Sequence, residues 1–214
     1  MAIQLIGVST STICDVDAGF KAQRVSIRPI ESTGWVSVGA ATQAITGAAI
    51  NQPLFSLRNL AASSLIIRRI GIGATTVTAF TAPQLLEYGL IMCRNFTVSD
   101  TGGLQIAFSG SNAKVRTASS TVSSVDCRIA TTAALTGGTK ILDSNALSIN
   151  HIYSAAVGSS LPSSLNNMYY SDTASYPIII AQNEGINILN LAAYGAGGAV
   201  KVYVNIEFAE AATF

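Results

Sequence analysis

Few residues of this chain are of a type that could do chemistry, and they are scattered. Catalysis needs a nucleophile beside a base, a pair of carboxylates or a metal cluster. The chain has one histidine, His151, and no carboxylate is adjacent to it in the sequence. A single histidine excludes a zinc site with several histidine ligands. We therefore expect His151 to be structural or solvated, and the protein not to be an enzyme.

Asp15 and Asp17 form a close carboxylate pair, with Gly19 two residues further on. Carboxylates at this spacing could contact Ca²⁺. The run matches only a fragment of an EF-hand loop, because the glycine is misplaced and the distal glutamate is missing. A turn with two solvated carboxylates is the favoured interpretation. The sequence predicts no metal site and no cofactor.

The three cysteines, Cys14, Cys93 and Cys127, lie far apart in the sequence. An odd number without a Cys-x-x-Cys pair argues against a zinc site and against a disulfide framework. Cys93 and Cys127 fall in strand-like runs, where a free cysteine behaves as a small hydrophobic residue. We predict buried free thiols and folding in a reducing cytoplasm.

Four tyrosines stand out in the C-terminal half of the chain, near turns that are rich in serine and alanine: Tyr153, Tyr169, Tyr170 and Tyr194. Tyrosine is common in protein interfaces and in packed cores, because it combines an apolar ring with a polar tip. The same residues could form a glycan-binding surface. We take the four tyrosines as candidate interface residues.

The composition is apolar and nearly uncharged. Of 214 residues, 49% are hydrophobic and 11% are charged, and the net charge is +1. The usual share of charged residues is about 25%. A surface with so little charge gives little repulsion between molecules. An extracellular-type β domain with serine and threonine on its wet faces is one explanation. We favour the other, that much of the surface is interface in a larger assembly.

Nucleic-acid and membrane partners are not expected. The chain has 12 basic and 11 acidic residues, so no basic excess marks a nucleic-acid interface. The local cluster Arg68-Arg69 lies in a strand-like run, where adjacent side chains point to opposite faces. No uninterrupted apolar run reaches the length of about 18 residues that a transmembrane helix needs. The start, Met1–Val8, lacks the basic and long apolar regions of a secretory signal.

The clearest structural pattern lies near the C-terminus, in Ser175–Phe208. Turns at Gln182–Gly185 and Ala193–Gly198 divide this stretch into three strands, which we expect to form hairpins. In the last strand, apolar and polar residues alternate with a period of two, which predicts one buried and one wet face. The residues of the predicted buried face are Val200, Val202, Val204, Ile206 and Phe208.

Other segments repeat the pattern. A helix over Pro83–Arg94 is an alternative, but the alternation there favours a strand. Ile152–Ala174 is the longest region without a strong pattern.

With about eight to ten strands, the chain is expected to be all-β, an antiparallel two-sheet β-sandwich of jelly-roll type. Residues 33–214 would form one domain, and residues 1–32 an extended N-terminal arm or edge strand. The predicted strands before the C-terminal stretch include Gly34–Ile45, Leu54–Asn59, Ser64–Thr78, Leu85–Phe96, Leu104–Phe108 and Val122–Ile129.

Several segments between about residues 55 and 210 also carry a likeness to a known family. They are Arg68–Phe96, Arg94–Gly103, Asn112–Thr117, Arg128–Leu135, Pro177–Gly185 and Val204–Glu210. In these segments the chain resembles small structural proteins encoded in the head-gene region of tailed bacteriophages. Within that group it resembles capsid cement, or decoration, proteins.

The resemblance implies a function that needs no active site. Cement proteins are usually β-sandwich trimers that sit on the outer shell where capsomers meet. By this likeness the protein is a virion structural protein, made in the host cytoplasm and placed on the capsid surface. Its expected partners are itself, as a homotrimer, and the major capsid protein. The alternative is a fibre or tail-associated virion protein that binds a host receptor or glycan.

Overall fold

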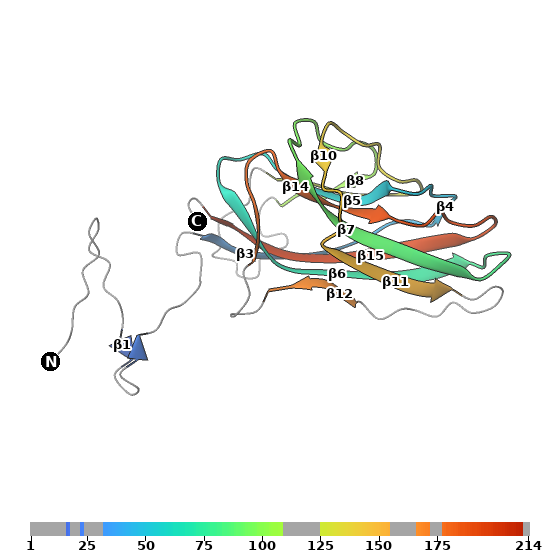
Figure 1. The fold of residues 1–214 in the computed structure, drawn as a ribbon, viewed down its shortest axis with the longest axis horizontal. Coiled ribbons are helices and arrows are strands. Elements are labelled where there is room, and N and C mark those ends of the chain that lie inside the picture. Colours follow the sequence, from blue (N-terminus) through green and yellow to red (C-terminus); the bar gives the residue numbers. More distant parts are fainter. Residues whose placement is uncertain are drawn as a thin grey trace.

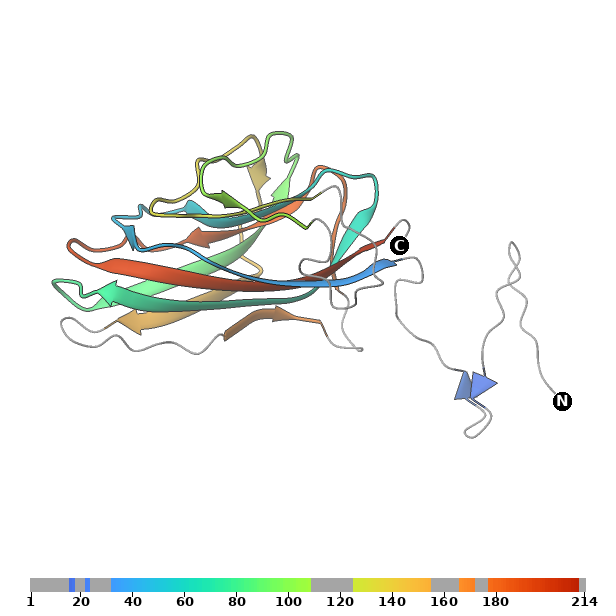
Figure 2. The same cartoon turned by 180° about the vertical axis from the view of Figure 1, so that it is seen from behind.

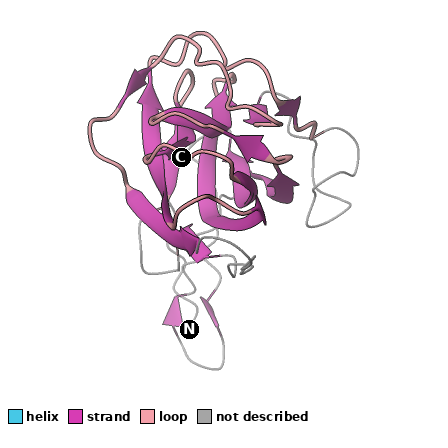
Figure 3. Ribbon diagram, turned by 90° about the vertical axis from the view of Figure 1, so that its right-hand side faces the viewer, coloured by secondary structure: helices cyan, strands magenta, loops and turns pink. Residues whose placement is uncertain are grey.

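The computed structural model describes residues 16–17, 22–23, 32–108, 125–154, 166–171 and 177–211. In these ranges the regular structure is entirely β (Figure 3). Two antiparallel sheets, of seven and six strands, pack face to face, which confirms the predicted all-β sandwich (Figure 1). Two short strands nearer the N-terminus, β1 (Val16–Asp17) and β2 (Ala22–Gln23), pair with each other. The rest of the predicted N-terminal arm lies outside the described residues.

The seven-stranded sheet is built around two central strands, β14 (Gly185–Asn190) and β5 (Gln52–Asn59). On one side of this pair, β7 carries two short strands end to end along its outer edge. On the other side β9 and then β8 complete the sheet. The outer strands are β7 (Gln84–Arg94), β10 (Ile141–Leu142), β11 (Ser148–Ser154), β9 (Val125–Ile129) and β8 (Leu104–Gln105).

The six-stranded sheet is built around its two longest strands, β6 (Ser64–Thr78) and β15 (Ala199–Ala211), which pair along most of their length. Two short strands lie along the outer edge of β6, and two more along the outer edge of β15. These are β12 (Asn166–Tyr170), β13 (Ile178–Ile180), β3 (Ser32–Ala41) and β4 (Ile45–Thr46).

The three C-terminal strands do not form the hairpins that the sequence predicts. β13 pairs with β6 in one sheet, β14 pairs with β5 and β7 in the other, and β15 returns to pair with β6 and β3. Each turn therefore crosses from one sheet to the opposite one (Figure 2). The prediction of three strands separated by two turns is confirmed, and the prediction of their pairing is wrong. A short connection can arch over the core as readily as it can fold into a hairpin.

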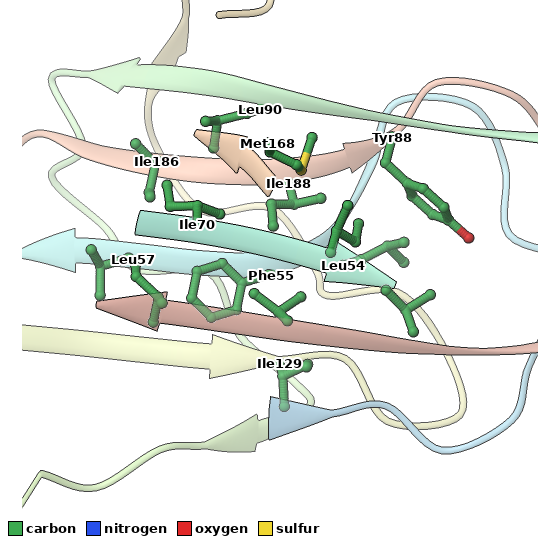
Figure 4. Close-up of a cluster of buried hydrophobic side chains, with 14 of the residues drawn as sticks. Leu54, Phe55, Leu57, Ile70, Tyr88, Leu90, Ile129, Met168, Ile186 and Ile188 are labelled. Carbon is green, nitrogen blue, oxygen red and sulfur yellow. The ribbon is translucent and has the colours of Figure 1, made fainter. Parts of the chain in front are cut away.

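The core lies between the sheets, and β15 supplies one wall of it. All five residues of the predicted buried face, from Val200 to Phe208, are at most 2% exposed. They belong to the same core cluster as side chains of the opposite sheet, such as Phe55 and Ile188, which are labelled in Figure 4. Burying one such aliphatic or aromatic side chain contributes about 1.5–3 kcal/mol. Period-two alternation therefore predicted this strand correctly.

The segment from residue 84 to 94 is a strand, which settles the alternative between strand and helix. Leu86, Tyr88, Leu90 and Met92 point into the core, as the alternation predicted. The opposite face of the same strand is also covered, because Cys93 is fully buried there. Part of the seven-stranded sheet is thus buried on both faces.

Arg68 and Arg69 do not point to opposite faces of the sandwich as predicted, because both are exposed. The register between β15 and β6 shifts here, so that Glu207 lies opposite Arg69 and Phe208 lies opposite Ile67. The extra residue is a β-bulge, which turns two consecutive side chains outward. Arg68 pairs with Glu207 at 2.9 Å and Arg69 donates to Asn167 at 2.8 Å, so both guanidinium groups have protein partners.

The region over residues 152–174, which showed no clear pattern in the sequence, contains regular structure. β11 runs on to Ser154, and β12 forms a second strand at residues 166–170. The parts between and after these strands, residues 155–165 and 172–174, lie outside the described residues. β12 has a bulge of its own between Asn167 and Tyr169, which explains why its alternation is hard to see.

We predict that Ile206→Ala lowers the free energy of unfolding by about 2–5 kcal/mol, since it empties a fully packed position. The matched control is the neighbouring Asn205→Ala, whose side chain points outward. This surface change should alter stability by no more than about 0.5 kcal/mol. Denaturant unfolding of both variants measures the difference. Equal losses at the two positions would contradict the assignment of faces on β15.

Candidate functional site

The structure places the four candidate interface tyrosines in different environments. Tyr153 and Tyr170 are exposed, at 61% and 53%. Tyr169 is half-buried, and its hydroxyl accepts a hydrogen bond of 2.8 Å from the backbone N–H of Ile178. Tyr194 is buried, and its hydroxyl lies 3.1 Å from that of Tyr88. Tyr194 is therefore a core residue and offers no surface to a partner.

The exposed tyrosines do not share one surface patch. Tyr153 is next to Ser154, whose hydroxyl lies 2.7 Å from that of Thr76 on β6. Tyr169, next to the exposed Tyr170, pairs with Ile70, which lies six residues before Thr76 on the same strand. Strands rise about 3.3 Å per residue, so the two positions are about 20 Å apart along β6. A single binding surface made of these tyrosines is not present.

A different apolar surface is found at one edge of the seven-stranded sheet. It consists of exposed side chains on β10, on β11 and on the turn between them, together with one residue of β7 that pairs with Tyr153. We call this surface the β10–β11 edge. Its members are Ile141, Leu142, Leu147, Ile149, Tyr153 and Leu85, which are between 38% and 61% exposed.

β11 lacks the features that normally protect an edge strand. Sheet edges are usually guarded by charged side chains, proline or a bulge. β11 reads Ser-Ile-Asn-His-Ile-Tyr-Ser, with no lysine, acid or proline, and it pairs with β7 without a register shift. Among the described strands none forms hydrogen bonds along its outer side, although β12 of the other sheet lies close to it. His151 is exposed between Ile149 and Tyr153, so the one histidine belongs to this edge.

A second feature lies on the outer face of the same sheet, where two loops cover β7 and β14. Four polar side chains meet there, and we call them the buried polar cluster: Cys93, Asp100, Lys140 and Asn187. Cys93, Asp100 and Asn187 are fully buried, and the side chain of Lys140 is 6% exposed. The strands supply Cys93 and Asn187, and the loops supply Asp100 and Lys140.

Asp100 is the centre of the cluster, and both of its carboxylate oxygens are engaged. Oδ1 pairs with the Nζ of Lys140 and accepts a hydrogen bond of 2.7 Å from the backbone N–H of Gly138. Oδ2 accepts a hydrogen bond of 2.8 Å from Nδ2 of Asn187. Cys93 donates from Sγ to Oδ1 of Asn187 at 2.6 Å. The amide of Asn187 is therefore held at both ends.

The environment sets the protonation of two members of the cluster. Burial alone would raise the pKa of Asp100, but hydrogen bonds from Gly138, Lys140 and Asn187 outweigh it, so that the pKa is lowered. Asp100 is thus a carboxylate opposite the Lys140 ammonium. Burial raises the pKa of the Cys93 thiol to about 12, against the opposing charge of Lys140. Cys93 therefore keeps its proton and acts as a donor.

Phe96 closes the cluster on one side. The Nζ of Lys140 lies 4.6 Å from the centre of its fully buried ring, in the arrangement of a cation–π contact. Charged groups without water interact strongly, because the surrounding medium screens them poorly. The arrangement thus brings an amine, a carboxylate and a carboxamide together in a site that excludes water.

No pattern in the sequence predicts this cluster. Asp100 lies in a Ser-Asp-Thr-Gly-Gly turn and Lys140 lies 40 residues later, so their spacing carries no signal. One local sign exists in hindsight: Asn187 interrupts the apolar run of β14, where every residue is buried. A buried amide in a central strand requires a polar partner.

The prediction of buried free thiols is confirmed for the two cysteines that lie among the described residues. Cys93 and Cys127 are buried free thiols, and burial raises the pKa of Cys127. Cys14 and Asp15 lie outside the described residues. Within the described part of the chain, no group of three or more His, Cys, Asp and Glu side chains is placed to hold a metal ion. In the same part, no helix has the length and apolar character needed to cross a membrane.

Comparison with protein-family models, with curated proteins and with solved structures gives no match for this chain.

The loop that carries Lys140 depends on Gly138. A Cβ atom there would collide with the carbonyl oxygens of Val98 and Ser99, whereas one at Gly137 would meet nothing. We predict that Gly138→Ala destabilises the protein by about 1–3 kcal/mol, the usual cost of overpacking. Gly137→Ala is the matched control and should be close to neutral. Thermal or denaturant unfolding of the pair tests this, and an equal effect at both glycines would refute it.

Proposed function

We propose that the protein is a virion structural protein that self-associates and cements the capsid of a tailed bacteriophage. The phage context comes from the resemblance of the segments between residues 55 and 210. The contribution of the structure is the β10–β11 edge, an apolar surface on a chain of net charge +1. This edge is the observation that carries the proposal, because several exposed large apolar side chains along one sheet edge are typical of an interaction surface.

We infer further that the sandwich is a jelly roll. The strand order supports this, since one sheet reads β3, β15, β6 and β12 and the other reads β5, β14, β7 and β11. Nearly every step along the chain between these strands crosses to the other sheet, and the exception joins the neighbours β7 and β11. Jelly rolls are common in viral capsid domains.

The occupant we propose for the β10–β11 edge is a second copy of this chain. Interface cores are more apolar than the rest of a protein surface and depleted of charge, and the named members of this edge are all uncharged. A neutral surface also removes the repulsion that keeps monomers apart. A homotrimer needs a head-to-tail contact that closes after three copies, so the edge of one protomer would meet a different surface of the next.

The three-fold symmetry of the proposed trimer would also strengthen its attachment to the shell. Three identical sites on one rigid body bind a symmetric array of major capsid protein far more firmly than a single site. The action proposed is mechanical, with no catalytic step. It takes place on the outer surface between capsomers, after synthesis in the host cytoplasm, and it involves neither nucleic acid nor a membrane.

The alternative of a receptor-binding or glycan-binding virion protein rested on the four tyrosines. Tyr194 is in the core, and Tyr153 lies far from the pair on β12. No described feature favours a sugar site over a protein interface.

We predict that the native protein is a trimer by light scattering and that Ile149→Lys reduces it to a monomer. A lysine at this position places a charge in the apolar contact, which must then be desolvated. The matched control is Leu104→Lys on β8, at the opposite edge of the same sheet. Both side chains are 59% exposed in the free chain, so folding should tolerate both changes.

The same two variants test attachment. Shells assembled without this protein should retain the native chain and Leu104→Lys in a co-sedimentation assay, and should retain much less of Ile149→Lys. A native mass equal to one chain, together with no retention on such shells, would overturn the proposal. Dissociation by Leu104→Lys, with Ile149→Lys still a trimer, would show that the β10–β11 edge is not the contact.

A further inference from the structure

The buried polar cluster has the parts needed to make a covalent bond, which the proposed function does not require. A lysine amine, an asparagine carboxamide and a carboxylate that touches both are enclosed together. A purely structural ion pair is a costly way to fill a buried site, because desolvation offsets the attraction of the charges. A reaction that neutralises both buried charges would remove this desolvation cost.

We propose that Lys140 and Asn187 join through an intramolecular amide bond, with Asp100 as the proton carrier. The nucleophile is Nζ of Lys140, and the carbon attacked is Cγ of Asn187. Asp100 touches the attacking nitrogen through Oδ1 and the leaving nitrogen, Nδ2 of Asn187, through Oδ2. One carboxylate thus bridges the group that must lose a proton and the group that must gain one, which is the geometry of general acid–base catalysis.

The side-chain carbonyl group of Asn187 is also positioned for attack by the amine. Cys93 donates to Oδ1 of Asn187 at 2.6 Å, where negative charge develops when Cγ is attacked. The backbone carbonyl of Phe55 accepts a second hydrogen bond from Nδ2, at 3.2 Å, and fixes the plane of the amide. Holding both reactants in one orientation makes an otherwise slow amide exchange effectively unimolecular.

The reaction is balanced without an oxidant, a reductant or a co-substrate. The Lys140 ammonium gives one proton to the Asp100 carboxylate, and the free amine forms the new C–N bond to Cγ. A second proton passes from the attacking nitrogen through Asp100 to Nδ2, the C–Nδ2 bond breaks, and ammonia leaves. The product is a secondary amide between the two side chains, and the first proton remains on Asp100.

The exclusion of water from the cluster favours formation of the amide bond over its hydrolysis. The Nζ of Lys140 stands beside the ring of Phe96, and the cluster is buried beneath two loops, so water is kept from the new amide. The bond would tie the loop before β10 to the central strand β14, next to the β10–β11 edge. The inference stands independently of the cement proposal, because a crosslink forms within one chain whatever the protein binds.

Peptide mapping of the native full-length chain tests the bond. Trypsin cuts after lysine and arginine, and between residues 129 and 201 the sole internal site is Lys140. A Lys140 amide resists cleavage, so residues 129–201 should appear as one peptide that is lighter than its sequence by one ammonia. Two separate peptides, 129–140 and 141–201, at their full masses would overturn the proposal.

Two further outcomes are informative. A branched product that joins residues 95–114 to Lys140 and is lighter by one water would place the bond on Asp100, and would overturn the role given to Asn187. Lys140→Met, which removes the nucleophile, should restore the full mass of the intact chain. The matched control, Lys201→Met on β15, should remain lighter by one ammonia. Because the peptide map uses the native chain alone, it decides the matter even if Lys140→Met fails to fold.

Discussion

The burial of one face of β15 is the constraint on which the rest of the structure depends. This strand pairs with β6 along most of its length and with β3 on its other side. Its inward side chains close the core against β5 and β14 of the opposite sheet. Because they are buried at every second position, the strand cannot slip by one residue without exposing its whole apolar face. The register of the six-stranded sheet follows from this.

The outer surfaces depend on the same packing. With β6 and β15 in the middle of one sheet and β14 and β5 in the middle of the other, the remaining strands lie toward the edges. β10 and β11 are among these, and their outward side chains have no described element to cover them. The sandwich is well packed inside and still carries exposed apolar side chains along this edge.

Local patterns in the sequence predicted much of the fold. β6 was predicted with its observed bounds, and β7 and β15 were predicted with the correct inward faces, since period-two burial is a property of the strand itself. The pairing of strands could not be read in the same way. Nothing local to the turn at Gln182–Gly185 decides whether it closes a hairpin or crosses the core. The bulge at Arg68 likewise arises from the register of β15, more than 130 residues away.

The candidate sites were less predictable than the fold. The tyrosines were chosen by residue type, and residue type does not separate Tyr194 in the core from Tyr153 on the surface. The buried polar cluster joins residues from three distant parts of the chain, so it exists only once the sheet and its two covering loops are in place. Its one local sign is Asn187 within the apolar run of β14. The β10–β11 edge was missed because Ile141–Asn150 is too short and irregular for its alternation to be recognised.

An electron cryo-microscopy map of the virion that carries this chain tests the central claim most directly. The account predicts sandwich-shaped density on the outer shell between capsomers, in groups of three, with the β10–β11 edge of each copy facing its neighbour. Density for this chain in a tail or fibre, or single copies with that edge open to solvent, would contradict it.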